Sequence, residues 1–167
     1  MNTLDIAIGN ICSLLAMVTD SVSSAQKTAK RVLWMQTLSQ LIYFTGTVVL
    51  KGYSGAVQNA VSILRNLVAI KNINSKAIEW ILVGLGVGLG LGFNNLGLIG
   101  LLPVAANLQY TLSIFRFKDN ERALKISFMI SIGLFAIFNL FIYNWVGAFG
   151  NAVVCITTAV GLIRTKK

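Results

Sequence analysis

The chain has 167 residues, of which 56% are hydrophobic and 11% charged, and its 14 basic and five acidic side chains give a net charge of +9. Soluble domains usually carry about a quarter charged residues. This composition, with a mean hydropathy of +0.76, argues against a soluble domain and predicts a polytopic membrane protein. Histidine is absent and both cysteines, Cys12 and Cys155, lie in apolar runs. We therefore expect packing thiols, no metal site and no cofactor.

Seven apolar segments follow one another along the chain, each about long enough to cross a bilayer as a helix. They cover residues 4–25, 32–50, 53–70, 77–94, 96–115, 123–143 and 146–163. Three of the joins are short enough to predict tight hairpins. No segment is left over for a soluble domain, so the pattern predicts an all-α membrane protein with one transmembrane domain over residues 1–167.

The basic residues predict how the helices are oriented. Alternate connections and the C-terminal tail hold 12 of the 14, namely Lys27, Lys30, Arg31, Lys71, Lys76, Arg116, Lys118, Arg122, Lys125, Arg164, Lys166 and Lys167. The opposite side holds only Lys51, and Arg65 lies within a span. Since positive charge marks the cytoplasmic side, we expect the N-terminus outside and the C-terminus in the cytoplasm. This rule accounts for the net charge, so we do not expect nucleic-acid binding.

The third and seventh segments share a pattern. "GYSGAVQNAV" from Gly52 matches "NWVGAFGNAV" from Asn144, and upstream "LLAMVTD" matches "LLPVAAN", which aligns Asp20 with Asn107. The matching units, residues 1–71 and 96–167, have the same orientation and flank a linker helix at 72–95. This is a parallel 3+1+3 repeat, the plan of SWEET-type transporters. Shared composition of two apolar helices is the alternative.

The stretch "GYSGAVQNAVSILRNL", preceded by "SSAQKTAKRVLWMQ", resembles the YgjV-type bacterial inner-membrane proteins, which are similar to SWEET and PQ-loop transporters. "LLPVAANLQYTLSIFRFKDNERALKISFM" fits the same pattern. The resemblance implies a bacterial inner-membrane location. It also implies that Asn59 and Asn151 lie beside a substrate. The first unit has Ala16 where a PQ-type helix carries proline, so Pro103 is the one candidate hinge.

Two amides related by the repeat would converge on a central cavity. Asn59 and Asn151 could then bind a neutral polyol, amide or nucleoside-like solute, and Asn107 is a further candidate. Lining aromatic residues are expected from Tyr43, Tyr110 or Trp145. Gln58 lies about 100° around the helix from Asn59 and is expected to face elsewhere. The alternative role for the amides is interhelical hydrogen bonding.

Arg65 lies about 9 Å inside the basic end of its span, and Asp20 lies at a similar depth in the first span. Matching depths predict an Asp20–Arg65 ion pair that acts as an inner latch. The alternatives are that Arg65 extends to the lipid headgroups or contacts a charged part of a substrate. Asp20 is the only acidic candidate for a proton relay, so we expect passive facilitation.

The linker helix carries two rows of glycines: Gly84, Gly88 and Gly92 in one row, with Gly86 and Gly90 in the other. A phosphate-binding loop would need a strand before it and a helix after it, and this segment is a span. The rows instead predict two smooth faces that let neighbouring helices approach closely.

The leading hypothesis is a facilitator for a small polar solute that works by rocking of two three-helix units. A non-transporting receptor, scaffold or assembly protein is the alternative, and it would need no polar cavity. No nucleophile–base pair or paired carboxylate predicts an enzyme. The expected partners are the solute and the lipid bilayer, with a homo-oligomer left open.

The orientation can be tested with reporter fusions at Lys167 and within the loop 116–125. Both should report the cytoplasm, because the basic residues cluster on that side. An external signal from either fusion would contradict the seven-span topology.

Overall fold

The computed structural model describes residues 2–24, 29–71, 73, 75–117 and 120–164. They form seven α-helices and no strand, which confirms the all-α prediction for this part of the chain. The helices are α1 (Thr3–Ser24), α2 (Ala29–Val49), α3 (Tyr53–Ile70), α4 (Lys76–Gly92), α5 (Leu101–Arg116), α6 (Glu121–Phe141) and α7 (Trp145–Arg164). Four basic residues used in the orientation argument, Lys27, Lys118, Lys166 and Lys167, lie outside the described residues.

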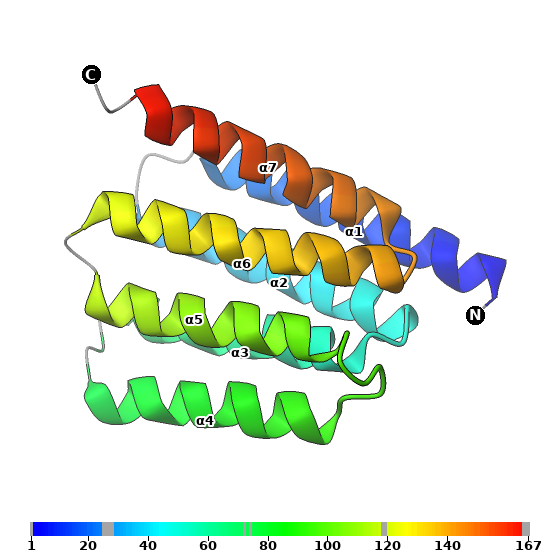
Figure 1. Cartoon of the computed structure of the whole chain (residues 1–167), viewed down its shortest axis with the longest axis horizontal. Helices are drawn as coiled ribbons and strands as arrows, with labels where there is room; N and C mark the ends of the chain where they lie inside the picture. Colours follow the sequence, from blue (N-terminus) through cyan, green and yellow to red (C-terminus); the bar gives the residue numbers. More distant parts are fainter. Residues whose placement is uncertain (1, 25–28, 72, 74, 118–119, 165–167) are drawn as a thin grey trace.

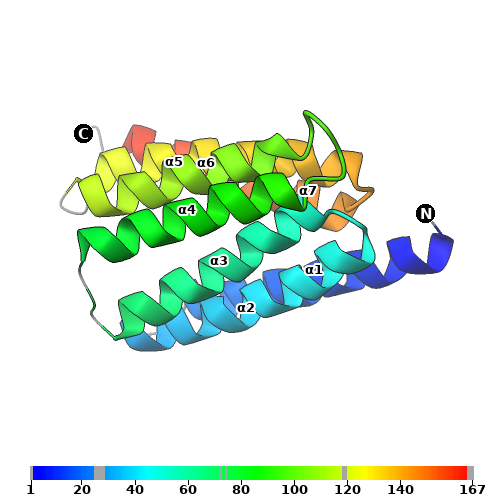
Figure 2. The same ribbon diagram turned by 90° about the horizontal axis from the view of Figure 1, so that it is seen from below.

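The helices form two layers, with α1, α2 and α3 in one layer and α5, α6 and α7 in the other (Figures 1 and 2). Each helix packs against the next one along the chain. The layers meet where α1 packs against α7 and where α3 packs against α5. Helix α4 lies along the α3–α5 edge and contacts both helices. The ring is therefore closed, and α1 and α3 are separated by α2.

The α2–α3, α4–α5 and α6–α7 connections all lie at one end of the molecule, which we call the turn end (Figure 1). The opposite end, where the C-terminus lies, is the basic end. An apolar cluster of Leu50, Phe138 and Ile142 fills the turn end, with Leu96, Ile99 and Leu102 packed against it. The Phe138 ring lies so close to Gly55 that any side chain at Gly55 would overlap it. Glycine here allows α6 to contact the start of α3.

Two turns at this end share one backbone conformation. Lys51, in the α2–α3 turn, has a φ of 57°, and Tyr143, in the α6–α7 turn, has a φ of 60°. In each turn the following N–H bonds a carbonyl five residues back: Gly52 to Thr47 and Asn144 to Asn139, both at 2.9 Å. Non-glycine residues rarely adopt positive φ. The two turns therefore share an uncommon backbone conformation at equivalent positions.

The fifth helix begins later than predicted, and this changes the role of Pro103. The predicted span 96–115 would put Pro103 in a helix interior, whereas α5 begins at Leu101. Residues 93–100 form a connection that includes Gly97 at a φ of 57°. A proline in the first turn removes no intrahelical hydrogen bond and causes no kink. The hinge prediction for Pro103 is thus not supported by the structure.

One of the two predicted smooth faces of α4 is in contact with its neighbours. A Cβ at Gly90 would lie 2.5 Å from Gln58 Nε2 and 2.7 Å from Val104 Cγ2. The row of Gly84, Gly88 and Gly92 faces open space, and no atom lies within 4 Å of a Cβ built there. The prediction of two close-packed faces is therefore wrong for the row of Gly84, Gly88 and Gly92.

By length and composition, one described helical segment, Thr3–Val22, clearly qualifies to cross a membrane. Lys125–Phe141 and Trp145–Val160 are apolar but shorter. Helices α4 and α5 have only 17 and 16 residues. Large apolar side chains such as Ile11, Trp80 and Phe149 are nevertheless exposed on the outer faces of the helices. Membrane crossing by the other six helices remains a prediction.

The two glycine rows of α4 supply a matched pair of variants. Gly90→Val should destabilise the protein by roughly 1–3 kcal/mol, because the new methyl groups overlap Gln58 and Val104. Gly88→Val, on the open face, should change stability by less than about 0.5 kcal/mol. Melting curves of both variants in the same detergent provide the comparison. Equal losses at the two positions would contradict the observed orientation of α4.

Candidate functional site

Buried polar side chains are concentrated on α3 and α5. On α3 they are Ser54, Gln58, Asn59, Ser62 and Asn66, and on α5 they are Asn107, Thr111 and Ser113. Ser54, Gln58, Ser62 and Asn66 are spaced four residues apart and share one helix face. A polar stripe buried inside an apolar exterior needs partners, because unpaired amides are costly away from water.

A chain of hydrogen bonds joins α4, α3 and α5. Gln58 Nε2 donates to the Gly86 carbonyl at 2.8 Å, and Asn107 Nδ2 donates to Gln58 Oε1 at 2.7 Å. Arg65 Nη1 then donates to Asn107 Oδ1 at 3.0 Å. Both ends of the two amides are used, so each side chain has one orientation that satisfies the network. We call Gly86, Gln58, Asn107 and Arg65 the α3–α5 network.

Arg65 makes two further contacts with α5. Its Nη1 lies 3.4 Å from Thr111 Oγ1, and its guanidinium carbon lies 5.2 Å from the centre of the Tyr110 ring. The Tyr110 ring packs in turn against Phe128 of α6, with centroids 5.4 Å apart. A cation over an aromatic face is electrostatically favourable. Both of these hydrogen bonds are donated by Nη1.

The predicted Asp20–Arg65 ion pair does not form between these two described residues. Asp20 Oδ1 accepts a hydrogen bond from Ser39 Oγ of α2. Arg65 instead turns to α5. The prediction compared how deep the two residues lie along their helices. It did not consider which helices lie side by side. Helix α2 lies between α1 and α3, so the two side chains face different neighbours.

Glu79, in the first turn of α4, is a buried carboxylate. It is only 8% exposed. The bond between Gln58 and Gly86 sets the register of α3 against α4. Arg65 lies seven residues after Gln58 on α3, and Glu79 lies seven residues before Gly86 on α4, which runs in the opposite direction. Seven residues are two turns, so the two charges occupy the same level on facing helices. Among the described residues no ion pair joins them. The ribbons of α3 and α4 diverge toward the basic end (Figure 2).

The two asparagines predicted to converge occupy different surroundings. Asn59 is buried, and its Nδ2 donates to Thr47 Oγ1 at 3.3 Å. Asn151, on α7, is half-buried. Helix α3 packs mainly against α2, α4 and α5, while α7 packs against α6 and α1. No described contact brings the two amides together, and their binding role remains a prediction.

The candidate aromatic residues also lie in different surroundings. Tyr110 belongs to the cluster around Arg65, and Tyr43 is half-buried on α2. Trp145 is 54% exposed and packs edge to face against Tyr143, with centroids 6.1 Å apart. An exposed tryptophan at a helix start suits the membrane–water interface. The structure does not support a lining role for Trp145.

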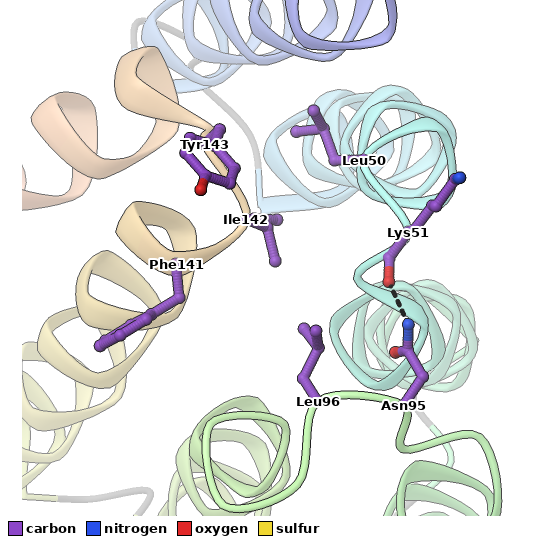
Figure 3. Close-up of a pocket in the computed structure, with 7 residues that line it drawn as sticks. All are labelled: Leu50, Lys51, Asn95, Leu96, Phe141, Ile142 and Tyr143. Carbon is purple, nitrogen blue, oxygen red and sulfur yellow. Dashed lines mark hydrogen bonds between the residues drawn. The ribbon is translucent and has the colours of Figure 1, made fainter. Parts of the chain in front are cut away.

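A cavity of about 240 Å³ lies at the turn end and is mainly apolar (Figure 3). It is lined by Leu50, Lys51, Asn95, Leu96, Phe141, Ile142 and Tyr143. Asn95 Nδ2 donates to the Lys51 carbonyl across one edge of this cavity at 2.7 Å. The cavity therefore lies between the two turns that share the left-handed conformation.

Gln58 is the residue that sequence reasoning missed. It was expected to point away from the site because it lies about 100° from Asn59, yet it is the centre of the α3–α5 network. The four-residue spacing of Ser54, Gln58 and Ser62 is visible in the sequence and indicates that these polar residues share one face of the helix. That stripe indicates the buried face of α3 better than Asn59 alone.

A double-mutant cycle tests which partner Arg65 has. Arg65→Gln and Asn107→Leu should show a coupling energy between about 0.5 and 3 kcal/mol, because the two residues share a hydrogen bond. The matched cycle of Arg65→Gln with Asp20→Asn should be additive within about 0.5 kcal/mol. Denaturation of the parent protein, the three single variants and the two double variants gives both values. Strong coupling to Asp20 alone would contradict the arrangement.

Comparison with curated proteins and with solved structures found no match. The Imp-YgjV family model, described as "Bacterial inner membrane protein", matches residues 7–167. That match spans nearly the whole described chain and agrees with its apolar exterior. It confirms the expected family and the bacterial inner-membrane location. The chain belongs to this family of bacterial inner membrane proteins.

Proposed function

We propose that the chain is a membrane transporter that facilitates the passage of a small polar solute. The observation that carries this proposal is the α3–α5 network, a set of amide and guanidinium groups enclosed by helices whose outer faces are apolar. Ionisable and polar groups inside membrane helices mark solute pathways more often than chance, because each is costly to bury.

The matched turns support a parallel 3+1+3 arrangement related to that of SWEET-type transporters. Lys51 and Tyr143 are 92 residues apart, and Asn59 and Asn151 have the same separation. The two residues with the same positive φ therefore follow the register of the sequence repeat. Alternating access would then come from rocking of unit one (α1 to α3) against unit two (α5 to α7).

The proposed solute path runs between the layers from the turn end. Asn59 lies one turn deeper than Gly55, which contacts Phe138 in the apolar cluster. Arg65 lies about 9 Å further toward the basic end. Asn59, Asn151, Asn107, Tyr43 and Tyr110 are the side chains that we propose bind the solute. Their amide and hydroxyl groups suit a solute with several hydrogen-bonding groups.

A non-transporting scaffold or receptor is the second candidate. The observation in its favour is that Gln58 and Asn107 already satisfy each other. Interhelical amides of this kind stabilise membrane bundles by about 0.6 kcal/mol on average. A purely structural network would need no solute.

Uptake measurements with a matched control distinguish the two functions. Thermal shift across a panel of metabolites would first identify a stabilising solute, and vesicles would then test its uptake. Asn59→Leu should abolish uptake while changing the melting temperature only slightly. Thr45→Leu replaces an exposed α2 hydroxyl whose bond within the described part of the chain is to the Leu41 carbonyl of its own helix, and it should leave uptake unchanged. Normal uptake by Asn59→Leu would remove Asn59 from the site. If no solute shifts the melting curve or enters vesicles, the scaffold is favoured.

A further inference from the structure

Both left-handed turns at the turn end have their carbonyl bound by an asparagine from another part of the fold. Asn95 Nδ2, in the α4–α5 connection, donates to the Lys51 carbonyl at 2.7 Å (Figure 3). Asn10 Nδ2, on α1, donates to the Tyr143 carbonyl at 2.9 Å. Lys51 belongs to unit one and Tyr143 to unit two. We call these two bonds the asparagine ties.

The Asn10 tie has a second bond. Asn10 Oδ1 accepts from the Val146 backbone N–H at 2.9 Å, which satisfies one of the unpaired donors at the start of α7. The same amide thus holds a carbonyl before α7 and an N–H in its first turn. This connection fixes α1 against the start of α7 at the edge where the two layers meet.

Other asparagines at the turn end serve their own loops. Asn94 Nδ2 donates to the Gly97 carbonyl at 2.8 Å, three residues away. Asn144 Oδ1 accepts from the Gly147 N–H at 3.0 Å, also three residues away. These are local turn bonds. The ties differ because Asn10 and Asn95 cross 133 and 44 residues of sequence, so they join separate elements.

The residues that the ties hold in place are those that close this end. Leu50 directly precedes Lys51, and Ile142 directly precedes Tyr143; both are only 2% exposed. They pack with Phe138 in the apolar cluster and line the cavity in Figure 3. A movement of either turn would therefore move one wall of the cluster. The backbone conformation of each turn adds to this, because positive φ at non-glycine residues persists only where the surroundings hold it.

We propose that the asparagine ties are the locks of a gate at the turn end. With both ties formed, Leu50, Ile142 and Phe138 exclude water from the level of Asn59. When both are broken, the two turns separate and the cluster opens. The role of this gate in a transport cycle rests on the proposed function, whereas the opening itself is a property of the folded chain.

The experiment measures how readily a cysteine in the cluster reacts. Ile142→Cys is made in a protein with Cys12→Ser and Cys155→Ser, and the purified protein is placed in nanodiscs and treated with a polar maleimide. Asn10→Ala or Asn95→Ala should raise the labelling rate a few-fold, and the double variant by about tenfold or more, because each lost bond favours the open form. The matched control Asn120→Ala removes an amide cap at the basic end and should leave the rate unchanged.

Parent-like labelling in both tie variants would overturn the gate, provided that their melting curves show a folded protein. If a variant does not fold, the opposite manipulation replaces it. Cysteines at positions 51 and 95, introduced in a protein that keeps Ile142 and lacks Cys12 and Cys155, are joined by a short thiol-reactive cross-linker. The cross-link should slow amide hydrogen exchange of residues 138–144 relative to the uncross-linked protein. An unchanged rate would equally refute the gate. Labelling requires no solute, so it tests the gate separately from transport. If the tie variants label faster but no solute is taken up, the gate stands and the transport function is contradicted.

Discussion

The structure depends on one constraint: polar groups placed inside apolar helices must satisfy one another. Gln58, Asn107 and Arg65 meet it by sharing their donors and acceptors across α3 and α5. Because an unpaired amide or guanidinium is costly away from water, the network fixes the register of three helices. The glycines of α4 are part of this solution, since Gly86 and Gly90 leave room for the Gln58 side chain to reach a backbone carbonyl.

Lateral order decides which charged groups can meet. The layers contact one another at two edges, α1 with α7 and α3 with α5, and α2 separates α1 from α3. Asp20 and Arg65 consequently have different partners although they lie at similar depths. Arg65 has no acidic partner among the residues it touches, and the facing carboxylate Glu79 comes from α4. Arg65 and Glu79 thus lie beside the α3–α5 edge, whereas Asp20 lies on α1 and bonds α2.

Hydropathy and turn residues were enough to predict seven helices, with most boundaries within a few residues, because apolar runs and short polar joins follow directly from local chemistry. The start of α5 was placed five residues too early because residues 96–100 are apolar yet form part of a connection around Gly97. Residue pairing was not predictable in the same way. Gln58 and Glu79 are buried because of where α4 packs, and a sequence pattern does not contain that lateral arrangement.

Helix α3 links the two ends of the molecule. Its start carries Gly55, which contacts Phe138 in the apolar cluster, and follows directly from the Lys51 turn that Asn95 holds. Its middle carries Gln58 and Arg65, which bind α4 and α5. A helix with an intact hydrogen-bond ladder moves as a rigid element, so a displacement of the Lys51 turn would be transmitted to the α3–α5 network, to Gln58 about 10 Å away and to Arg65 about 20 Å away. The same bonds that satisfy the buried polar groups therefore resist motion of that turn, and any opening of the turn end has to strain or rearrange them.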